Sequence, residues 1–179
     1  MSGLEQRALV WIAPYWNADH LVRTRDWAME LEPDARQALR LAALTHDMER
    51  HFPDGPSYDP ATMAPDDEEY QRAHSERSAR IVTGWLRAEG ADEQLVGDVG
   101  DLVLRHECGG GREADVLQAA DSISFLEINK ELPFRWARQG RCTIERGLDH
   151  HRWMFERIRL EDARKLAQPF YEQAVALAA

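Results

Sequence analysis

Apolar residues recur at helical spacing along almost the whole chain, and this periodicity is the strongest constraint on its fold. No segment shows the alternation of apolar and polar residues that is typical of a half-buried β-strand. We therefore expect an all-α protein. The predicted helices span residues 4–14, 18–31, 34–50, 66–89, 92–107, 112–130, 142–158 and 160–177.

Four of these predicted helices carry an ionisable side chain within the apolar stripe that faces the core. These side chains are His46, His74, His106 and Asp121. A single histidine on an apolar face is more often a hydrogen-bonded core residue than a ligand. Four such helices in one small domain favour a metal site, because helical bundles build metal sites from side chains on facing helices.

The adjacent pair His46 and Asp47 adds to this prediction. Neighbours on a helix point about 100° apart, so a metal in front of the seam between them can take both side chains. The second oxygen of Asp47 can bridge to another ion or hold a metal-bound water. Imidazole and carboxylate ligands suit iron, manganese, nickel or zinc, and the lack of thiolates argues against a structural zinc site.

The order of these residues resembles a known family. A histidine, a His-Asp pair and a distant aspartate occur here as His20, His46-Asp47 and Asp121, each in a helical context. Arg23 follows the first histidine by three residues, and the last aspartate follows an alanine. This set resembles the HD-domain superfamily of metal-dependent phosphohydrolases. The resemblance spans residues 20–121 and implies a helical bundle, here with a C-terminal helical extension.

The resemblance also implies a ligand set. One divalent ion would be held by His20, His46, Asp47 and Asp121. Members with two metals have two further histidines before the final aspartate, and His74 and His106 fall in that interval, so a second ion would be held by Asp47, His74 and His106. A mononuclear site, with His74 and His106 contacting the substrate phosphate, stays open.

Two features depart from the family pattern. Only 15 residues separate His106 from Asp121. Met48-Glu49-Arg50 follows the His-Asp pair where many members have Gly-Lys; Arg50 keeps the positive charge, whereas Glu49 is unusual.

The activity that the resemblance implies is hydrolysis of a small phosphomonoester or phosphodiester, including nucleotides, with one or two ions of iron, manganese, nickel, zinc or magnesium. Asp47 would bridge the ions or orient the attacking water, and His74 or His106, if not a ligand, could protonate the leaving oxygen. Arg23 and Arg50 are candidates for holding the phosphate, because a guanidinium offers a planar fork to its oxygens. For Arg50, a solvated charge at a helix C-terminus is an equally good explanation.

Two other functions remain open from the sequence. One is a diiron oxygenase with the same fold, since four histidines and two carboxylates also suit that chemistry. The other is a non-catalytic module that binds a ligand or a partner. The segment 52–65 and the basic segment near residue 135 would then be binding surfaces.

The length of 179 residues predicts one domain, with the metal-site core at about 18–130 and C-terminal helices at about 131–179. The segment 52–65 contains four prolines and cannot be helical throughout; such a loop can be a lid, a binding loop or a surface linker. His150 and His151 could close over the site, but we favour an exposed face for both. We expect His51 to be a surface residue or a functional one, and the six tryptophans to lie mostly in the core.

The bulk composition bears on partners and location. The net charge of −10 argues against a protein that coats nucleic acid, but leaves a small anionic substrate open. Lys130, Arg135, Arg138 and Arg141 form a local basic cluster that could attract such a substrate, and a solvated face or a subunit contact explains it equally well. With two cysteines, no signal sequence and no apolar stretch of membrane-spanning length, we expect a soluble cytoplasmic protein.

Overall fold

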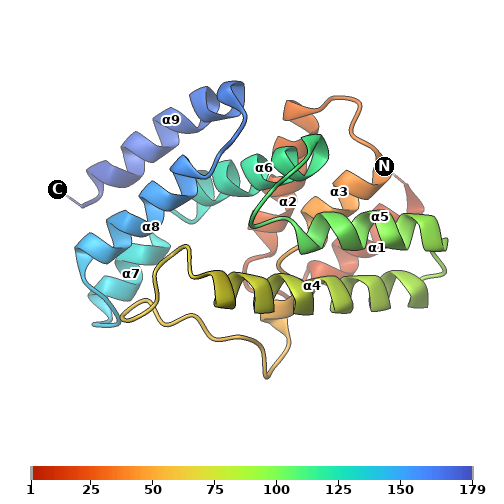
Figure 1. The fold of residues 1–179 in the computed structure, drawn as a ribbon, viewed down its shortest axis with the longest axis horizontal. Helices are drawn as coiled ribbons and strands as arrows, with labels where there is room; N and C mark the ends of the chain where they lie inside the picture. Colours follow the sequence, from red (N-terminus) through yellow and green to blue (C-terminus); the bar gives the residue numbers. More distant parts are fainter. Residues whose placement is uncertain (1, 179) are drawn as a thin grey trace.

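All regular secondary structure in the described part of the chain, residues 2–178 of a computed structural model, is helical (Figure 1). The elements are α1 (Gly3–Ile12), α2 (Ala18–Leu31), α3 (Gln37–Thr45), the 3-10 turn η1 (Met48–His51), α4 (Glu68–Ala88), α5 (Glu93–Leu104), α6 (Arg112–Ile128), α7 (Leu132–Arg138), α8 (Ile144–Glu156) and α9 (Glu161–Ala176). The prediction of an all-α protein is therefore confirmed.

Two predicted helices were too long, and the difference matters for the site. The helix predicted at 34–50 ends at Thr45. His46 keeps a helical backbone as the C-cap, whereas Asp47, with φ −101° and ψ 6°, has left the helix before η1 begins. His106 lies two residues beyond the last residue of α5. Both histidines are thus placed by helix ends, and the argument from neighbours on a continuous helix was wrong for the His46-Asp47 pair.

The helix starts have local causes in the sequence. The carboxylates of Asp67 and Asp92 accept hydrogen bonds from backbone N–H groups three residues later, at 2.8 and 2.9 Å, and so cap α4 and α5. The hydroxyl of Thr143 caps α8 in the same way. Such caps satisfy N–H groups that lack a partner within the helix. The sequence therefore defines where these three helices begin.

The turn between α5 and α6 requires glycine. Gly109, Gly110 and Gly111 have φ values of 66°, 101° and 140°, a backbone region that residues with a Cβ rarely adopt. Helix α5 ends earlier, at Leu104, and these glycines turn the chain into α6, which begins at Arg112. The short turn brings His106 close to α6, the helix that carries Asp121.

The helices form two groups that share α6. In Figure 1, α1, α3, α4 and α5 lie on one side and α7, α8 and α9 on the other. Helix α2 packs against α3 and α6, while α6 also contacts α8 and α9. Helix α7, which the sequence did not predict, packs against α8. The C-terminal helices therefore contact the same element that carries Asp121.

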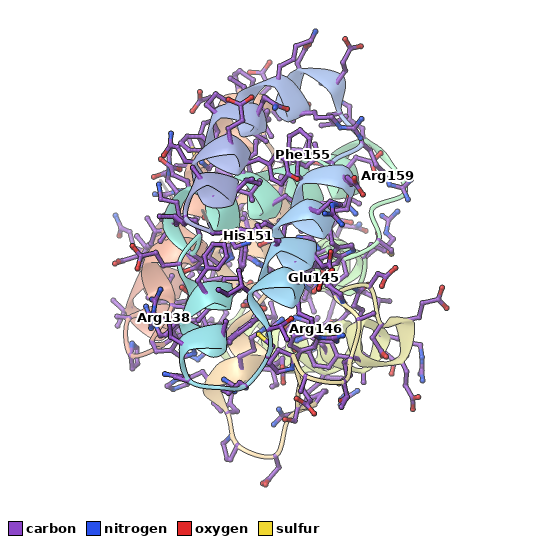
Figure 2. All side chains as sticks on the ribbon, turned by 90° about the vertical axis from the view of Figure 1, so that its left-hand side faces the viewer. Arg138, Glu145, Arg146, His151, Phe155 and Arg159 are labelled. Atoms are coloured by element: carbon purple, nitrogen blue, oxygen red, sulfur yellow. The ribbon has the colours of Figure 1, made fainter. Side chains whose placement is uncertain are left out.

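The proline-rich segment, residues 52–65, runs between η1 and α4 without regular structure and is hydrogen-bonded to α8. Arg146 of α8 donates hydrogen bonds to the carbonyl oxygens of Pro60 and Met63, at 2.6 and 2.5 Å (Figure 2). The loop is therefore joined to the C-terminal helices. Within residues 2–178, no helix combines the length and the apolarity that crossing a bilayer needs.

Candidate metal centre

The four histidines that the sequence singled out are buried close to one another. The exposed fractions of His20, His46, His74 and His106 are 3%, 1%, 0% and 1%. The ring centroids of His46 and His106 are 5.1 Å apart, and those of His74 and His106 are 5.2 Å apart. The chain thus gathers four imidazoles from α2, α4 and the ends of α3 and α5 into one small volume.

Backbone carbonyls fix the orientation of two of these rings. Nδ1 of His46 lies 3.1 Å from the carbonyl oxygen of Ala43, and Nδ1 of His106 lies 2.7 Å from that of Val103. A carbonyl can only accept, so each Nδ1 carries the proton. In the neutral rings, Nε2 then has a free lone pair, which is the state that a metal ligand needs.

Side chains hold the other two rings. The hydroxyl of Ser124 donates to the carbonyl oxygen of His20 at 3.0 Å, so its oxygen is free to accept from Nδ1 of His20, 2.9 Å away. Nδ1 of His74 lies 2.9 Å from Oε1 of Glu49. A carboxylate behind a ligating imidazole is a common feature of metal sites, because it orients the ring and raises its basicity. Glu49, which departs from the family pattern, therefore has a structural explanation.

The first cluster of candidate ligands consists of His20, His46 and Asp47, and Asp121 faces it. Oδ1 of Asp121 lies 3.0 Å from Nε2 of His20 and 3.4 Å from Nε2 of His46. Two ligand atoms each about 2.1 Å from one ion and separated by 90–109° would be roughly 3.0–3.4 Å apart. The atoms of His20, His46 and Asp47 also lie within 4.8 Å of one another. These distances fit a single divalent cation.

The second cluster consists of Asp47, His74 and His106, and so has Asp47 in common with the first. One ligand atom each of Asp47, His74 and His106 lies within 4.8 Å of the other two, and Oδ1 of Asp47 is 3.1 Å from Nε2 of His74. The other oxygen, Oδ2, accepts a hydrogen bond from the hydroxyl of Tyr15 at 3.2 Å. The structure thus brings all six predicted ligands into two adjoining groups with one carboxylate in common.

Two further charged residues belong to this site and were missed from the sequence. Oε1 of Glu107 lies 3.5 Å from Nε2 of His106 and 3.9 Å from Nε2 of His74. The guanidinium of Arg157, which follows α8, is bonded to both Glu107 and Asp121. The guanidinium pairs with Oδ2 of Asp121, while Oδ1 of Asp121 faces His20. Only the position of Glu107 next to His106 could have suggested it, whereas nothing in the sequence pointed to Arg157.

Nearby cations keep the buried carboxylates ionised. Burial alone would raise the pKa of Asp47, but Arg50 and His74 hold it well below its usual value. Burial opposes ionisation of Asp121 and Glu107 as well, and Arg157 lowers both pKa values. Metal ligation requires these ionised forms, so the donor set is chemically suited to a divalent cation.

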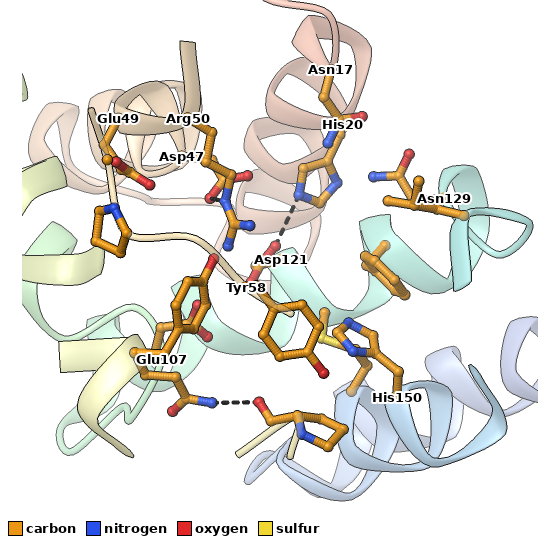
Figure 3. A pocket seen from close by; sticks show the side chains of 18 of the residues that line it. Asn17, His20, Asp47, Glu49, Arg50, Tyr58, Glu107, Asp121, Asn129 and His150 are labelled. Atoms are coloured by element: carbon orange, nitrogen blue, oxygen red, sulfur yellow. Dashed lines mark hydrogen bonds and ion pairs between the residues drawn. The ribbon is translucent and has the colours of Figure 1, made fainter. Parts of the chain in front are cut away.

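The two candidate ligand clusters border a cavity of about 470 Å³ (Figure 3). His20, Asp47, Glu107 and Asp121 line one part of it, together with Arg50 and Arg157. The rest of the lining includes aromatic side chains from the segment 52–65, α6, α7 and α8. This volume lies in the range of small-molecule binding sites.

The two arginines predicted to hold phosphate lie in different places. Arg50 lines the cavity, and its Nε donates to Oδ1 of Asp47 at 2.7 Å. Arg23 is not among the residues that line the cavity; its guanidinium is bonded to Glu127 at 2.6 and 3.2 Å and lies over the ring of Trp27. The structure thus places Arg23 away from this cavity, in an ion pair with Glu127.

The expectation that His150 and His151 lie on an exposed face was also wrong. His151 is fully buried, with its ring nitrogens 2.8 Å from the carbonyl oxygens of Gly147 and Lys130. His150 lines the cavity. Among the tryptophans, Trp16 is 64% exposed at the cavity and does not belong to the core.

Comparison with known proteins agrees with this geometry. A family model described as HD domain matches residues 17–126, which is more than half of the chain. This segment contains all six predicted metal ligands. No curated protein and no solved structure matched the chain. From the family match, together with the buried histidine and aspartate clusters, we conclude that the chain belongs to the HD-domain family.

Proposed function

We propose that this protein is a metal-dependent phosphohydrolase that acts on a small phosphomonoester or phosphodiester, including nucleotides. The observation that carries the proposal is the pair of donor clusters that share Asp47 and border the cavity. Members of the HD-domain family are typically phosphohydrolases, which supports the same activity. Two adjacent divalent cations are also a recurrent arrangement in phosphoryl-transfer enzymes.

The proposed ligands follow the two clusters. His20, His46, Asp47 and Asp121 would hold one ion, and Asp47, His74 and His106 would hold the other. The bond from Nδ1 of His106 to a carbonyl supports a ligand role, because it leaves Nε2 without a proton to give to a leaving group. A ligand role for His74 is supported by Glu49, which orients its ring through Nδ1.

When bound, divalent cations lower the pKa of a coordinated water to near neutrality and offset negative charge on phosphoryl oxygens. The protein's own side chains would position the reactants. Arg50 presents its guanidinium at the cavity beside Asp47 and would bind a phosphate oxygen. Tyr15 holds Oδ2 of Asp47, and Arg157 holds Glu107 and Asp121, so the carboxylates keep their orientation through turnover.

The test is phosphate release from purified protein that has been stripped of metal and reloaded with manganese, nickel, iron, zinc or magnesium. The substrates are p-nitrophenyl phosphate, bis(p-nitrophenyl) phosphate and nucleoside monophosphates. We expect metal-dependent release, and a loss of about a hundredfold or more in His46→Ala. Arg87→Ala, a change in an exposed ion pair with Glu93, is the matched control and should leave the rate unchanged.

Two results would contradict the proposal. One is release that proceeds equally in the metal-stripped protein. The other is a reloaded protein that releases no phosphate from any of these esters but consumes dioxygen in the presence of iron, which would favour the oxygenase.

A further inference from the structure

The part of the cavity away from the metal ligands is an aromatic enclosure. It is formed by Tyr58, Phe125, Trp136, His150 and Trp153, all of which line the cavity. The imidazole of His150 lies at its centre, with ring centroids 5.2 to 5.8 Å from those of the other four residues. Figure 3 shows Tyr58 and His150 next to each other in this region. Rings in such numbers offer flat faces for stacking.

Two polar atoms of residues that line the cavity, one of them in this enclosure, are buried and lack a partner. Among residues 2–178, neither Nδ1 of His150 nor Nδ2 of Asn129 has a hydrogen-bond partner. Asn129, the C-cap of α6, also lines the cavity. A buried polar atom without a partner costs free energy, which a ligand in the adjoining cavity would recover by bonding to it. The enclosure therefore has both stacking faces and unused hydrogen-bonding atoms.

The imidazole of His150 is uncharged at neutral pH. Burial lowers its pKa to about 3, and the nearby charges of His151, Arg157 and Arg50 act in the same direction, against Glu107. A neutral imidazole has one nitrogen that donates and one that accepts a hydrogen bond. It suits an uncharged ligand edge and gives no preference for a second anionic group.

We propose that this enclosure is a subsite for a planar, uncharged heteroaromatic ring, whose edge is read by His150 and Asn129. The inference rests on the proposed function, since the ring would belong to the substrate whose phosphate reaches the metal centre. Stacking on Trp136 and Tyr58 would supply affinity, and the two polar side chains would select rings with hydrogen-bonding atoms at the edge.

The origin of these residues supports a role particular to this chain. Asn129, Trp136, His150 and Trp153 all lie beyond residue 126, where the family match ends. Tyr58 comes from the proline-rich segment, which Arg146 fixes to α8. The family core thus supplies the metal ligands, while the C-terminal helices and the loop shape the other half of the cavity.

The test separates ring binding from hydrolysis. Calorimetric titration of the metal-loaded protein with adenosine, guanosine, cytidine and uridine, which lack phosphate, measures the subsite alone. Ribose 5-phosphate, which lacks the ring, is the comparison ligand. We expect at least one nucleoside to bind, and His150→Phe and Asn129→Leu each to weaken that binding about three- to tenfold, as the loss of one hydrogen bond implies. Binding of ribose 5-phosphate should not change.

Arg152→Ala is the matched control, because it alters an exposed residue on the same helix as His150 and should leave nucleoside binding intact. If His150→Phe does not fold, as judged by circular dichroism, Asn129→Leu carries the test. The inference is overturned if no nucleoside binds the wild-type protein, or if both variants bind as tightly as wild type. Nucleoside binding without any phosphate release would instead contradict the proposed hydrolase activity and still support the ring-binding subsite.

Discussion

At the scale of single residues, the centre depends on groups that stand behind the proposed ligands. His20, His46, His74 and His106 each have Nδ1 engaged by Ser124, a carbonyl or Glu49. These bonds choose the tautomer and aim Nε2 at the carboxylates. They also explain how four imidazoles can be buried together, since each ring keeps a polar partner. Glu49 is the one charged member of this supporting set.

Glu49→Gln should weaken metal binding at the second cluster. The substitution keeps the shape of the side chain but removes the charge behind His74, so we expect a loss of about 10- to 100-fold in affinity for one of two ions. Competition with a fluorescent chelator measures this loss. Glu68→Gln, at an exposed position of the same region, is the control. If Glu49→Gln bound both ions as tightly as Glu68→Gln does, Glu49 would not support a ligand.

At the scale of elements, the sequence predicted helices better than it predicted their ends. The helix predicted at 18–31 matches α2, and the starts of α4, α5 and α8 lie within two residues of prediction, where capping side chains mark them. The C-terminal end of α3 was wrong by five residues. No local signal marks that end: the hydroxyl of Ser78, on α4, donates to the carbonyl oxygen of His46. A contact between residues 32 apart in sequence cannot be read from periodicity.

Ser78→Ala should destabilise the fold through this helix end. The carbonyl of His46 would lose its buried partner, at a cost of about 1–3 kcal/mol in the free energy of unfolding. Urea denaturation measures the change, with Arg80→Ala, exposed on the same helix, as the control. If Ser78→Ala were as stable as the control, the bond from Ser78 to the carbonyl of His46 would not stabilise the end of α3.

At the scale of the whole molecule, the C-terminal helices are tied to the metal centre through Arg157. Its side chain is only 6% exposed and pairs with Glu107, which precedes the glycine turn, and with Asp121 of α6, which follows it. The apolar stripes pointed to His46, His74, His106 and Asp121, and the family resemblance added His20; the structure brings these side chains together. The sequence could not predict Arg157, whose position depends on how α8 packs against α6. For Glu107, the neighbouring His106 was the only signal.

Arg157→Met should make the fold more dependent on metal. Without the guanidinium, two buried carboxylates face the histidines uncompensated, so the metal-free protein should lose about 3–5 kcal/mol of stability. A bound cation would offset that charge, and the rise in melting temperature on adding manganese should exceed that of wild type. Thermal denaturation with and without chelator measures both values. Arg159→Met, at an exposed position two residues on, is the control; a rise no larger in Arg157→Met than in this control would disprove the link.

The most direct test of the account is the number of ions that each chain binds. Elemental analysis of the reloaded, desalted protein should give about two divalent ions per chain in wild type, about one in His74→Ala, and about none in Asp47→Ala, because Asp47 belongs to both clusters. Circular dichroism should show that each variant keeps its helices. A wild-type protein that binds no divalent ion, or an Asp47→Ala variant that keeps the full wild-type content, would contradict the proposed centre.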